Sequence, residues 1–470
     1  MDAMRDVPAS RTVPDATLRL FESSIRGELL RPGDARYEAA RQVWNGMIDR
    51  RPAFVVRCRD AADVGAAVGF ARDHGLPLAV RGGGHNVAGH AVCDGGVVAD
   101  LSPMKGIRVD AKARSVRAEG GCTWGDLDHA THAYGLAAPG GMISTTGIAG
   151  LTLGGGIGHL TRRYGLAADN LLSADLVLAD GRLVTAGADC NPDLYWAIRG
   201  GGGNFGVVTS FEFRLHPVAT VLAGPVLYPL EKAREALRHY RDFVDDAPDD
   251  VSAFFAFLVV PPGPPFPAPL HNRTVCGVCV CCTAPPAQAA KLVAPLRRFG
   301  PPLLDLVGTV PFPALQSMFD PLVPAGLQSY WRAEFADELT DAVIEAHLKH
   351  GPSVPTPNSA VHIYPTGGAA GRVGKHETAY FFRDARYVQL VAAIYSDPTE
   401  TAARVRWVRD YWQALRARSS GGGYVNFMMD EGDERVRATF GGNYPRLTQV
   451  KARYDPRNLF RLNQNVAPRA

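Results

Sequence analysis

The segment LPLAVRGGGHNVAGHAVCDGG, residues 76–96, decides how the first part of this chain folds. Its apolar start predicts a β-strand that runs into three consecutive glycines, Gly82, Gly83 and Gly84, and His85 follows at once. Glycine lacks a Cβ atom, so it adopts positive φ angles and lets another molecule lie directly against the backbone. We therefore expect a ligand on this loop, with the imidazole of His85 facing it.

The composition is that of an ordinary globular protein. The chain has 470 residues, 46% of them hydrophobic and 21% charged, and this length predicts two or three domains. The formal net charge is +3, and no basic block indicates binding to nucleic acid or to a membrane surface. No segment has the pattern of a signal peptide or of a transmembrane span, so we expect a soluble, cytoplasmic protein.

Helix signals are clear on the N-terminal side of the glycine loop. Residues 60–75 predict a helix that Asp60, or alternatively Asp63, caps and that Gly75 ends, with a short strand on either side. Residues 15–30 predict an amphipathic helix. The mixture of helices with many short strands predicts an α+β fold rather than a doubly wound parallel sheet.

Two turns further along carry signals of their own. Asp180-Gly181 lies between apolar runs and predicts a hairpin with a type I′ turn, which requires positive φ angles at both turn residues. Asn191 and Pro192 predict the start of a short helix, with Asn191 as its cap and Pro192 at its first position.

The pattern changes after residue 217. Long apolar strands then alternate with helices as far as residue 420. This alternation predicts a second domain, built on an antiparallel sheet that helices cover on one face.

Three glycine-rich segments, residues 82–84, 140–158 and 200–206, lie in the first half of the chain. The last contains GxGxxG, but a helix precedes it and a strand follows, the reverse of a dinucleotide-binding Rossmann unit. No GxxxxGK[ST] sequence is present, so a P-loop is excluded. Glycine-rich turns can present consecutive N–H groups to an anion, so three of them favour a long, phosphate-bearing ligand over simple surface turns.

A metal site is the main alternative for the cysteines and histidines. Cys276 and Cys279 form a CxxC, but they lie in an apolar strand and no second pair follows, so we favour packed thiols. The histidines near the first loop have no spacing typical of a ligand set. These histidines are His85, His90, His129, His132 and His159.

Four segments together resemble a known family: residues 80–110, 135–182, 191–217 and 424–466. They are similar to the FAD-linked oxidases of the berberine bridge enzyme-like group, in the vanillyl-alcohol oxidase and p-cresol methylhydroxylase superfamily. The resemblance implies a split FAD-binding domain of the p-cresol methylhydroxylase type with an inserted substrate domain. The implied ranges are 1–217 for the FAD-binding domain, with its core at 53–217, 218–420 for the substrate-binding domain, and 421–470 for a C-terminal segment that returns to the FAD domain.

The resemblance also implies how FAD is held. In this family the loop that matches residues 81–86 cradles the pyrophosphate, and the histidine that matches His85 is joined covalently to the flavin. Many members form a second link from a cysteine, but that position falls on Ile143, so we expect one covalent bond only; Cys122 is a poor substitute. The resemblance assigns the following residues to cofactor binding: Arg81, Gly82, Gly83, Gly84, His85, Asn86, Gly89, His90, Gly141, Ile143, Ser144, Thr145, Gly147, Gly150, Leu151, Gly154, Gly158, Gly203, Gly206, Val208, Tyr424, Asn426, Asn463 and Asn465.

The implied chemistry is hydride transfer from substrate to flavin, with a base that removes a proton. Tyr424 in the YVNF segment matches the tyrosine that family members use, and Tyr364 is a second candidate. A tyrosine has an ordinary pKa of about 10, so the pKa must be lowered for the base to act near neutrality. The alternatives are a flavin-stacking or structural role for Tyr424 and a place in the core of a central strand for Tyr364.

The expected function is therefore that of an FAD-dependent oxidase of a sugar or natural product, with molecular oxygen as the second substrate. Two alternatives stay open: a dehydrogenase that passes electrons to another acceptor, and a silent binding protein that keeps FAD structurally. The sequence does not identify the substrate.

Overall fold

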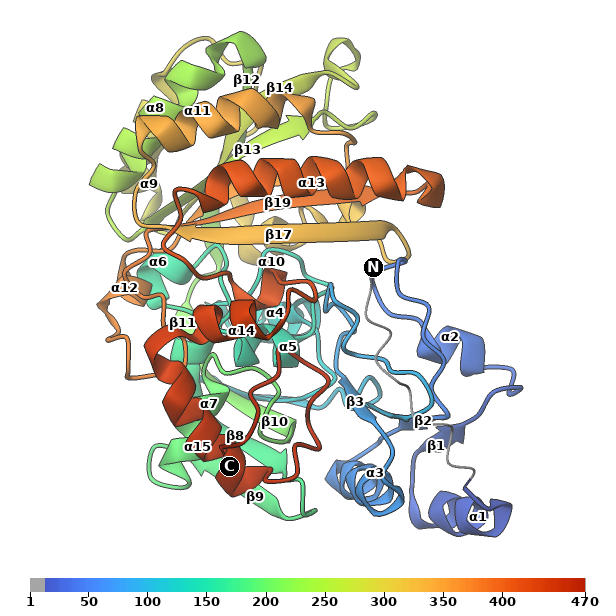
Figure 1. Cartoon of the computed structure of the whole chain (residues 1–470). Coiled ribbons are helices and arrows are strands. Elements are labelled where there is room, and N and C mark those ends of the chain that lie inside the picture. Colours follow the sequence, from blue (N-terminus) through green and yellow to red (C-terminus); the bar gives the residue numbers. More distant parts are fainter. Residues whose placement is uncertain (1–12, 470) are drawn as a thin grey trace.

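The computed structural model describes residues 13–469. The strands before residue 215 form two sheets, apart from the short β7 (Leu136–Ala137), which pairs with β11 (His216–Pro217). One has the order β1-β2-β4-β3, with β1 antiparallel to β2 and the other pairs parallel; its strands are β1 (Glu28–Leu30), β2 (Phe54–Arg57), β3 (Leu78–Arg81) and β4 (Val97–Asp100). The other is antiparallel, in the order β5-β6-β10-β8-β9: β5 (Ile107–Asp110), β6 (Ser115–Glu119), β8 (Leu171–Val177), β9 (Leu183–Gly187) and β10 (Val207–Arg214). Helix α3 (Ala61–His74) packs against strands of both sheets (Figure 1).

Helix α3 begins and ends where the sequence predicts. The Asp60 carboxylate accepts hydrogen bonds from the backbone N–H groups of Ala62 and Asp63, which confirms Asp60 as the cap. Gly75 has a φ of +64°, the left-handed conformation that glycine adopts without strain. The start of the strand that follows α3 is therefore fixed. The glycine loop comes directly after Arg81, at the end of this strand.

The largest sheet lies in the second half of the chain and is antiparallel throughout. Its order is β15-β12-β14-β13-β18-β19-β17, and β16 also pairs with β12. Its strands are β12 (Thr220–Pro229), β13 (Val251–Val259), β14 (Thr274–Cys282), β15 (Leu304–Asp305), β16 (Gly308–Pro311), β17 (Gln328–Ala336), β18 (Ala360–Pro365) and β19 (Tyr387–Tyr395). The predicted α+β class with an antiparallel sheet is confirmed, and every strand of this sheet lies within 218–420, the range we assign to the substrate domain.

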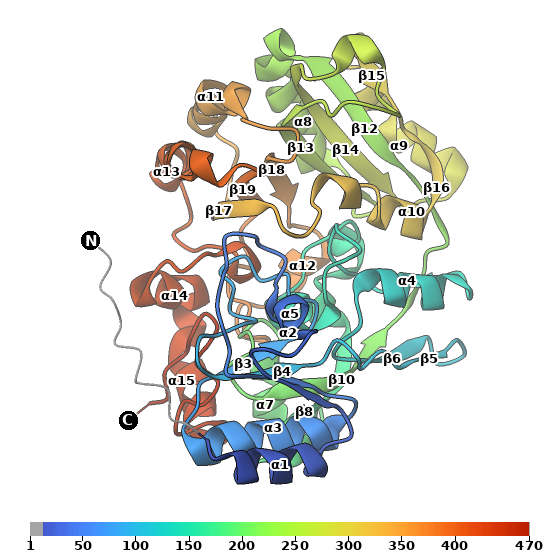
Figure 2. The same cartoon turned by 90° about the vertical axis from the view of Figure 1, so that its right-hand side faces the viewer.

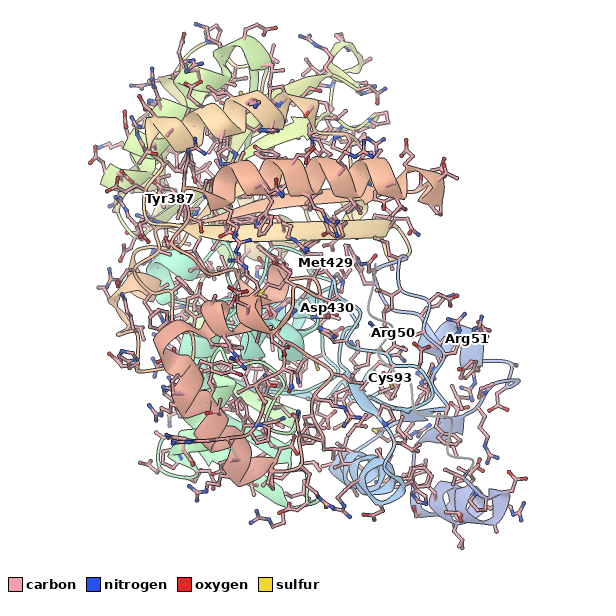
Figure 3. The ribbon with its side chains drawn as sticks, in the orientation of Figure 1. Arg50, Arg51, Cys93, Tyr387, Met429 and Asp430 are labelled. Atoms are coloured by element: carbon pink, nitrogen blue, oxygen red, sulfur yellow. The ribbon has the colours of Figure 1, made fainter. Side chains whose placement is uncertain are left out.

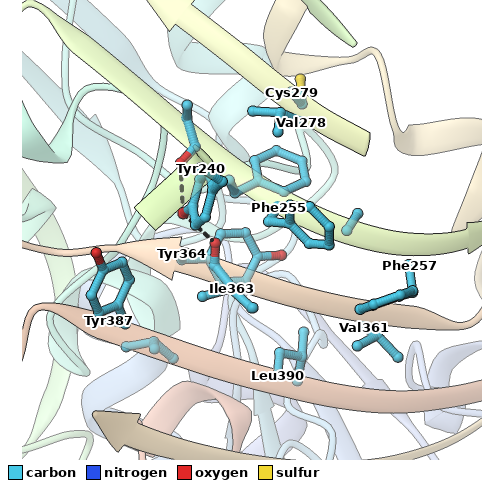
Figure 4. Close-up of a cluster of buried hydrophobic side chains, with 14 of the residues drawn as sticks. Tyr240, Phe255, Phe257, Val278, Cys279, Val361, Ile363, Tyr364, Tyr387 and Leu390 are labelled. Carbon is cyan, nitrogen blue, oxygen red and sulfur yellow. Dashed lines mark hydrogen bonds between the residues drawn. The ribbon is translucent and has the colours of Figure 1, made fainter. Parts of the chain in front are cut away.

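Helices cover the outer face of this sheet, the face turned away from the first half of the chain (Figure 1). They are α8 (Ala233–Asp246), α9 (Pro286–Arg298), α11 (Asp341–His350) and α13 (Thr401–Arg416). Tyr240 of α8 is fully buried, and its hydroxyl lies 3.0 Å from the carbonyl oxygen of Ala253 and 2.9 Å from that of Ile363 (Figure 4). Side chains alternate between the two faces of a strand. Phe255 and Ile363 therefore pack in the core on the outer face, while Tyr364 lies on the inner face.

The C-terminal segment returns to the first half of the chain, as Figure 2 shows for α14 (Asp433–Phe440) and α15 (Tyr444–Tyr454). The buried Lys451 of α15 donates hydrogen bonds to the carbonyl oxygen of Asn204 and to Asp455. The remaining α-helices and strands are α1 (Asp15–Ser24), α2 (Tyr37–Arg41), α4 (Trp124–His132), β7 (Leu136–Ala137), α5 (Ile148–Leu153), α6 (Thr161–Tyr164), α7 (Pro192–Ile198), β11 (His216–Pro217), α10 (Phe312–Gln316) and α12 (Ala369–Arg372).

The predicted helix over residues 15–30 is correct only as far as Ser24. Residues Glu28–Leu30 instead form β1, which pairs with β2. A Cβ atom on Gly27 would lie 2.0 Å from the carbonyl oxygen of Arg57, so the chain lies directly against β2 at this point. Pairing with a strand distant in sequence overrides the local helical pattern.

The two predicted turns also differ in detail. The hairpin between β8 and β9 forms, but only Gly181 has a positive φ, and the N–H of Leu178 bonds to the carbonyl oxygen of Arg182. The loop therefore has three residues and ends in a left-handed glycine, so the type I′ prediction is wrong. Asn191 precedes α7 as predicted, but its φ is +47° and its amide donates to the carbonyl oxygen of Thr185, so its side chain does not cap the helix.

Candidate active site

A cavity of about 390 Å³ lies between the inner face of the large sheet and the loops of the first half of the chain. All three glycine-rich segments and the C-terminal tail contribute to its wall. Among residues 13–469, no cluster of His, Cys, Asp and Glu side chains is arranged to hold a metal ion. The cysteines of β14 are buried, and burial raises the pKa of Cys276 and Cys279 to about 12, so they are packed thiols.

The first glycine loop packs directly against the second. A Cβ atom on Gly83 would lie 2.4 Å from the backbone nitrogen of Gly147, and one on Gly147 would lie 2.4 Å from the nitrogen of Gly83. A Cβ atom on Gly82 would lie 2.9 Å from the carbonyl oxygen of Gly120, and Gly84 has a φ of +69°. The protein's own packing or backbone conformation thus requires glycine at each position of the run. The ligand that the sequence suggests is therefore not the only reason for these glycines.

Two other glycines present bare backbone to the cavity. Gly150 of α5 and Gly203 line the wall, and a Cβ atom on either would meet no described protein atom within 4 Å. Side chains at these positions would project into open space. The wall therefore provides room for a ligand to lie against the backbone at two separated points, as an elongated cofactor requires.

His85 lies at the junction of the two loops. Its Nε2 is 3.0 Å from the hydroxyl of Thr145, and its Nδ1 is 3.5 Å from that of Thr146. The indole of Trp44 stacks on the imidazole with ring centroids 5.1 Å apart. Burial lowers the pKa of His85 to about 4, so the ring is neutral at physiological pH and keeps a lone pair for bonding.

Two polar atoms of the cavity wall have no partner in the described chain: Nε2 of His90 and Oδ1 of Asn463. Arg50 fixes the loop around His90, because it donates to the carbonyl oxygens of Gly89 and Val92. Figure 3 labels Arg50 beside Cys93. Buried polar groups are normally hydrogen-bonded, so such atoms on a cavity wall indicate a polar ligand. This observation and the bare glycines fit the phosphates and sugar of FAD.

Seventeen of the 24 residues expected to bind FAD lie on the cavity wall. They are Gly82, Gly83, Gly84, His85, Asn86, His90, Gly141, Ile143, Gly147, Gly150, Leu151, Gly203, Gly206, Val208, Tyr424, Asn426 and Asn463. The wall does not include Arg81, Gly89, Ser144, Thr145, Gly154, Gly158 and Asn465. Arg81 shows why: its guanidinium pairs with the buried Asp100 and so supports the loop from behind.

The Tyr424 hydroxyl receives three hydrogen bonds. The backbone N–H groups of Gly156 and Ile157 lie 3.0 and 3.1 Å from its oxygen, and Nδ2 of Asn426 lies 2.8 Å away. Asn426 also donates to the carbonyl oxygen of Leu151, which orients its amide nitrogen toward the tyrosine. Burial raises the pKa of Tyr424 above its ordinary value and the three donors oppose that rise, so the lowered pKa expected of a base is absent from the protein alone.

Tyr364 and His362 lie on the inner face of the large sheet, and both line the cavity. Nδ1 of His362 is 2.5 Å from the Tyr364 hydroxyl. Burial lowers the pKa of His362 to about 4 and raises that of Tyr364. Tyr364 therefore lines the cavity and is also tightly packed within its strand. Its hydroxyl contacts the neutral imidazole of His362.

Sequence reasoning missed several residues of the wall. Trp44 lies in a segment without any motif, and its stack on His85 arises only from the tertiary fold. Phe254 belongs to the apolar strand β13, which the sequence marks as core, and Trp331 belongs to β17, whose sequence QSYWRAEFA mixes apolar and polar residues. One local signal was available for the strands: alternate residues face the same side, so the position of Tyr364 implies that His362 shares its face.

Comparison with known proteins gives consistent matches along the chain. A family model described as an FAD binding domain matches residues 52–187, and one described as berberine and berberine like matches residues 423–467. An FAD-linked oxidoreductase of Dictyostelium discoideum is 33% identical over 457 residues, covering 95% of this chain and 96% of the relative. The (R)-6-hydroxynicotine oxidase of Paenarthrobacter nicotinovorans is 32% identical over 463 residues, covering 95% and 97%.

Solved structures share the whole architecture. The crystal structure of 6-hydroxy-D-nicotine oxidase from Arthrobacter nicotinovorans has a TM-score of 0.85 at 32% identity and covers 95% of this chain and 99% of its own. A berberine bridge enzyme-like protein of Physcomitrella patens also has a TM-score of 0.85, at 24% identity, and supports the fold alone. Within residues 13–469, no helix is long and apolar enough to cross a membrane.

Proposed function

Because this chain belongs to the berberine bridge enzyme-like FAD-linked oxidoreductases, we propose that it oxidises an alcohol- or amine-bearing small molecule by removing a hydride from a C–H bond, with molecular oxygen as the electron acceptor. The observation that carries the proposal is the cavity itself, where two glycine loops, a neutral histidine and a hydrogen-bonded tyrosine meet the inner face of the substrate sheet. Bound FAD would supply the hydride acceptor and, on reoxidation by oxygen, hydrogen peroxide.

We propose that His85 is the single covalent attachment point. The Thr145 and Thr146 hydroxyls and the Trp44 ring hold its imidazole at the cavity wall, and its neutral state suits bond formation to carbon. Ile143, where the family resemblance would place a second link through cysteine, lines the cavity and has no thiol. The buried Cys122 thiol points instead to the carbonyl oxygens of Met104 and Gly106.

Tyr424 is the proposed base that takes the substrate proton. A neutral phenol has two acceptor sites, whereas three donors converge on this oxygen, so these donors oppose the rise in pKa that burial causes and would stabilise a phenolate once the proton leaves. Asn426 and the N–H groups of Gly156 and Ile157 would stabilise the charge without any cation. Tyr364 is the second candidate, and its close contact with His362 gives it a neutral proton acceptor.

The mode of attachment is tested by acid denaturation of the purified holoprotein. We expect the yellow colour to remain with the polypeptide, and His85→Ala to release it. His129→Ala, at an exposed histidine of α4, is the matched control and should keep the colour bound. Free flavin in the supernatant of the unmodified protein would disprove covalent attachment.

The electron acceptor is tested separately, by reducing the flavin with substrate without oxygen and then admitting air. Rapid recovery of the oxidised spectrum together with hydrogen peroxide supports an oxidase. Slow recovery in air supports a dehydrogenase. Failure of any alcohol or amine to reduce the flavin supports the silent binding protein.

The role of Tyr424 predicts that Tyr424→Phe lowers the rate of flavin reduction by about 10²- to 10⁴-fold, the usual contribution of a general base. The FAD content should not change, because the phenyl ring keeps the packing of the tyrosine. Stopped-flow absorbance under anaerobic conditions measures the rate. If Tyr424→Phe reduces flavin normally and Tyr364→Phe does not, Tyr364 is the base.

A further inference from the structure

We propose that Arg435 is a positioning residue for the reaction: it anchors the glycine run at residues 421–423 to the large sheet and so holds the Tyr424 hydroxyl in place. This inference rests on the proposed role of Tyr424 as the base. It adds the group that holds the base, and this group does not line the cavity itself.

The glycine run directly precedes Tyr424, and three glycines in sequence are typical of a flexible linker. In the fold, however, the run pairs with β17, the edge strand of the large sheet. The N–H of Ser420 bonds to the carbonyl oxygen of Phe335 at 3.0 Å, and the N–H of Phe335 bonds to the carbonyl oxygen of Gly422 at 3.3 Å. The chain is therefore fixed to the sheet edge just before it turns toward the cavity.

Arg435 lies in the first turn of α14, and its guanidinium continues the pairing along this edge. Nη1 donates to the carbonyl oxygen of Gly421 at 3.0 Å, and Nη2 donates to that of Ala333 in β17 at 3.1 Å. A Cβ atom on Gly423 would lie 3.0 Å from Nη2, so the glycine run lies directly against the guanidinium. One side chain thus joins the run to the edge of the sheet.

Buried carboxylates hold the guanidinium in turn. Arg435 is 7% exposed and donates to Glu334 of β17 at 2.6 Å, and its Nε lies 3.5 Å from Glu431. Glu431 also pairs with Arg332 at 3.2 Å, and the Trp412 indole donates to Glu334 at 2.7 Å. Two arginines and two glutamates therefore balance each other's charge in a buried site. These contacts give the guanidinium of Arg435 one defined orientation.

The position of the Tyr424 hydroxyl depends on both ends of its segment. On the cavity side it accepts from the N–H groups of Gly156 and Ile157 and from Asn426. On the sheet side it follows three glycines, which have wide conformational freedom unless their backbone groups are bound. Arg435 restricts that freedom, and a displacement of about 1 Å at a reacting group can lower a rate by about 10²-fold. Arg435 therefore acts on the reaction through Tyr424.

Hydrogen–deuterium exchange of the FAD-loaded protein, measured by mass spectrometry over residues 420–428, tests the anchor without any substrate. Arg435→Met removes the charge and the hydrogen bonds, and we expect exchange in this segment to become about tenfold faster. Arg435→Lys keeps a charge for Glu334 but has a single donor nitrogen, so its exchange should lie between the two. Arg437→Met, at an exposed arginine of the same helix, is the matched control and should leave exchange unchanged.

The amides that bind the Tyr424 hydroxyl test whether Arg435 acts through the tyrosine. The N–H groups of Gly156 and Ile157 donate to this hydroxyl, so they should exchange faster in Tyr424→Phe. We expect Arg435→Met to speed their exchange when Tyr424 is present and to add little in Tyr424→Phe, because both changes break the same contacts. Arg435→Lys should restore part of the protection.

The outcomes separate this inference from the proposed function. Unchanged exchange over residues 420–428 in Arg435→Met, or in Arg435→Lys where the methionine variant does not fold, would overturn the anchor. An equal increase at Gly156 and Ile157 with and without the Tyr424 hydroxyl would show a general loss of stability and would overturn the positioning role. If exchange changes as expected but Tyr424→Phe reduces flavin at the normal rate, the anchor is supported and the proposed base is contradicted.

Discussion

Gly83 and Gly150 both lie on the cavity wall, yet a side chain at each would meet different surroundings. At Gly83 a Cβ atom would lie 2.4 Å from the backbone nitrogen of Gly147, and neither loop can yield without moving its backbone. At Gly150 the same atom would project into open space. One glycine is required by the protein's own packing, and the other leaves room for the cofactor.

This contrast predicts opposite effects of two alanine substitutions. Gly83→Ala should lower the free energy of unfolding of the apoprotein by about 1–3 kcal/mol, because overpacking displaces the loop. Gly150→Ala should leave that stability unchanged or raise it by up to about 1 kcal/mol, because alanine favours the helix, while lowering FAD content. Urea unfolding of the apoprotein and absorbance of the purified protein measure the two effects. Normal flavin content in Gly150→Ala would show that the cofactor does not approach this position.

At the scale of the elements, helices α4 and α10 join the two halves of the chain through buried polar groups. Asp128 of α4 is 2% exposed, and Nε2 of Gln316 of α10 donates to it at 3.3 Å. Its other carboxylate oxygen, Nε1 of Trp124 and Nδ1 of His132 have no partner in the described chain. Burial raises the pKa of Asp128 to about 7, although the bond from Gln316 lowers it.

The raised pKa sets the sign of a pH effect. Between about pH 4 and pH 7 the folded chain holds the Asp128 proton while the unfolded chain has lost it, so this residue lowers stability as the pH rises. Asp128→Asn removes the effect. Relative to the unmodified protein, the variant should gain up to about 3 kcal/mol on going from pH 5 to pH 8, as measured by urea unfolding at both values.

Asp126 provides the control on the same helix. Its carboxylate accepts from the backbone nitrogen and the hydroxyl of Thr123, and it pairs with Lys105. Asp126→Asn should therefore destabilise the protein at both pH values. If Asp128→Asn also loses stability at pH 8, Asp128 is ionised and paired in the folded protein.

At the scale of the whole molecule, a buried ion pair holds the first half of the chain to the second. Arg383 donates from both terminal nitrogens to the carboxylate of Asp169, at 2.8 and 2.6 Å. The two side chains are only 1% and 9% exposed. The cavity lies between the same two halves.

Removal of one partner should be costly because it leaves the other charge buried. Asp169→Asn is expected to lower the free energy of unfolding by about 3–5 kcal/mol, measured by urea unfolding of the holoprotein. Glu235→Gln, which removes an exposed pair with Lys232, is the control and should change the midpoint little. A small effect of Asp169→Asn would show that water reaches Arg383 and replaces the carboxylate.

The predictable parts of the fold and of the candidate site are those with local causes. The cap at Asp60, the glycine at Gly75 and the loop at His85 were predictable because a few neighbouring residues set them. The helix predicted over residues 15–30 was too long, because β1 forms only by pairing with β2, which is distant in sequence. Trp44 was missed because its contact with His85 joins segments that no local pattern connects.

By itself, the sequence determined the α+β class, the order of the glycine loops and the phosphate-bearing ligand expected on them, since strand alternation and side-chain-free turns are properties of short segments. The family resemblance then implied that this ligand is FAD. Only the tertiary structure decided what each glycine does, and which faces of the sheet turn inward. The segment RGGGHN shows the difference: its glycines predict a ligand, but Gly83 is glycine because Gly147 lies against it. The cavity wall likewise arises from strands and loops far apart in the chain, because only folding brings their inward side chains to one surface.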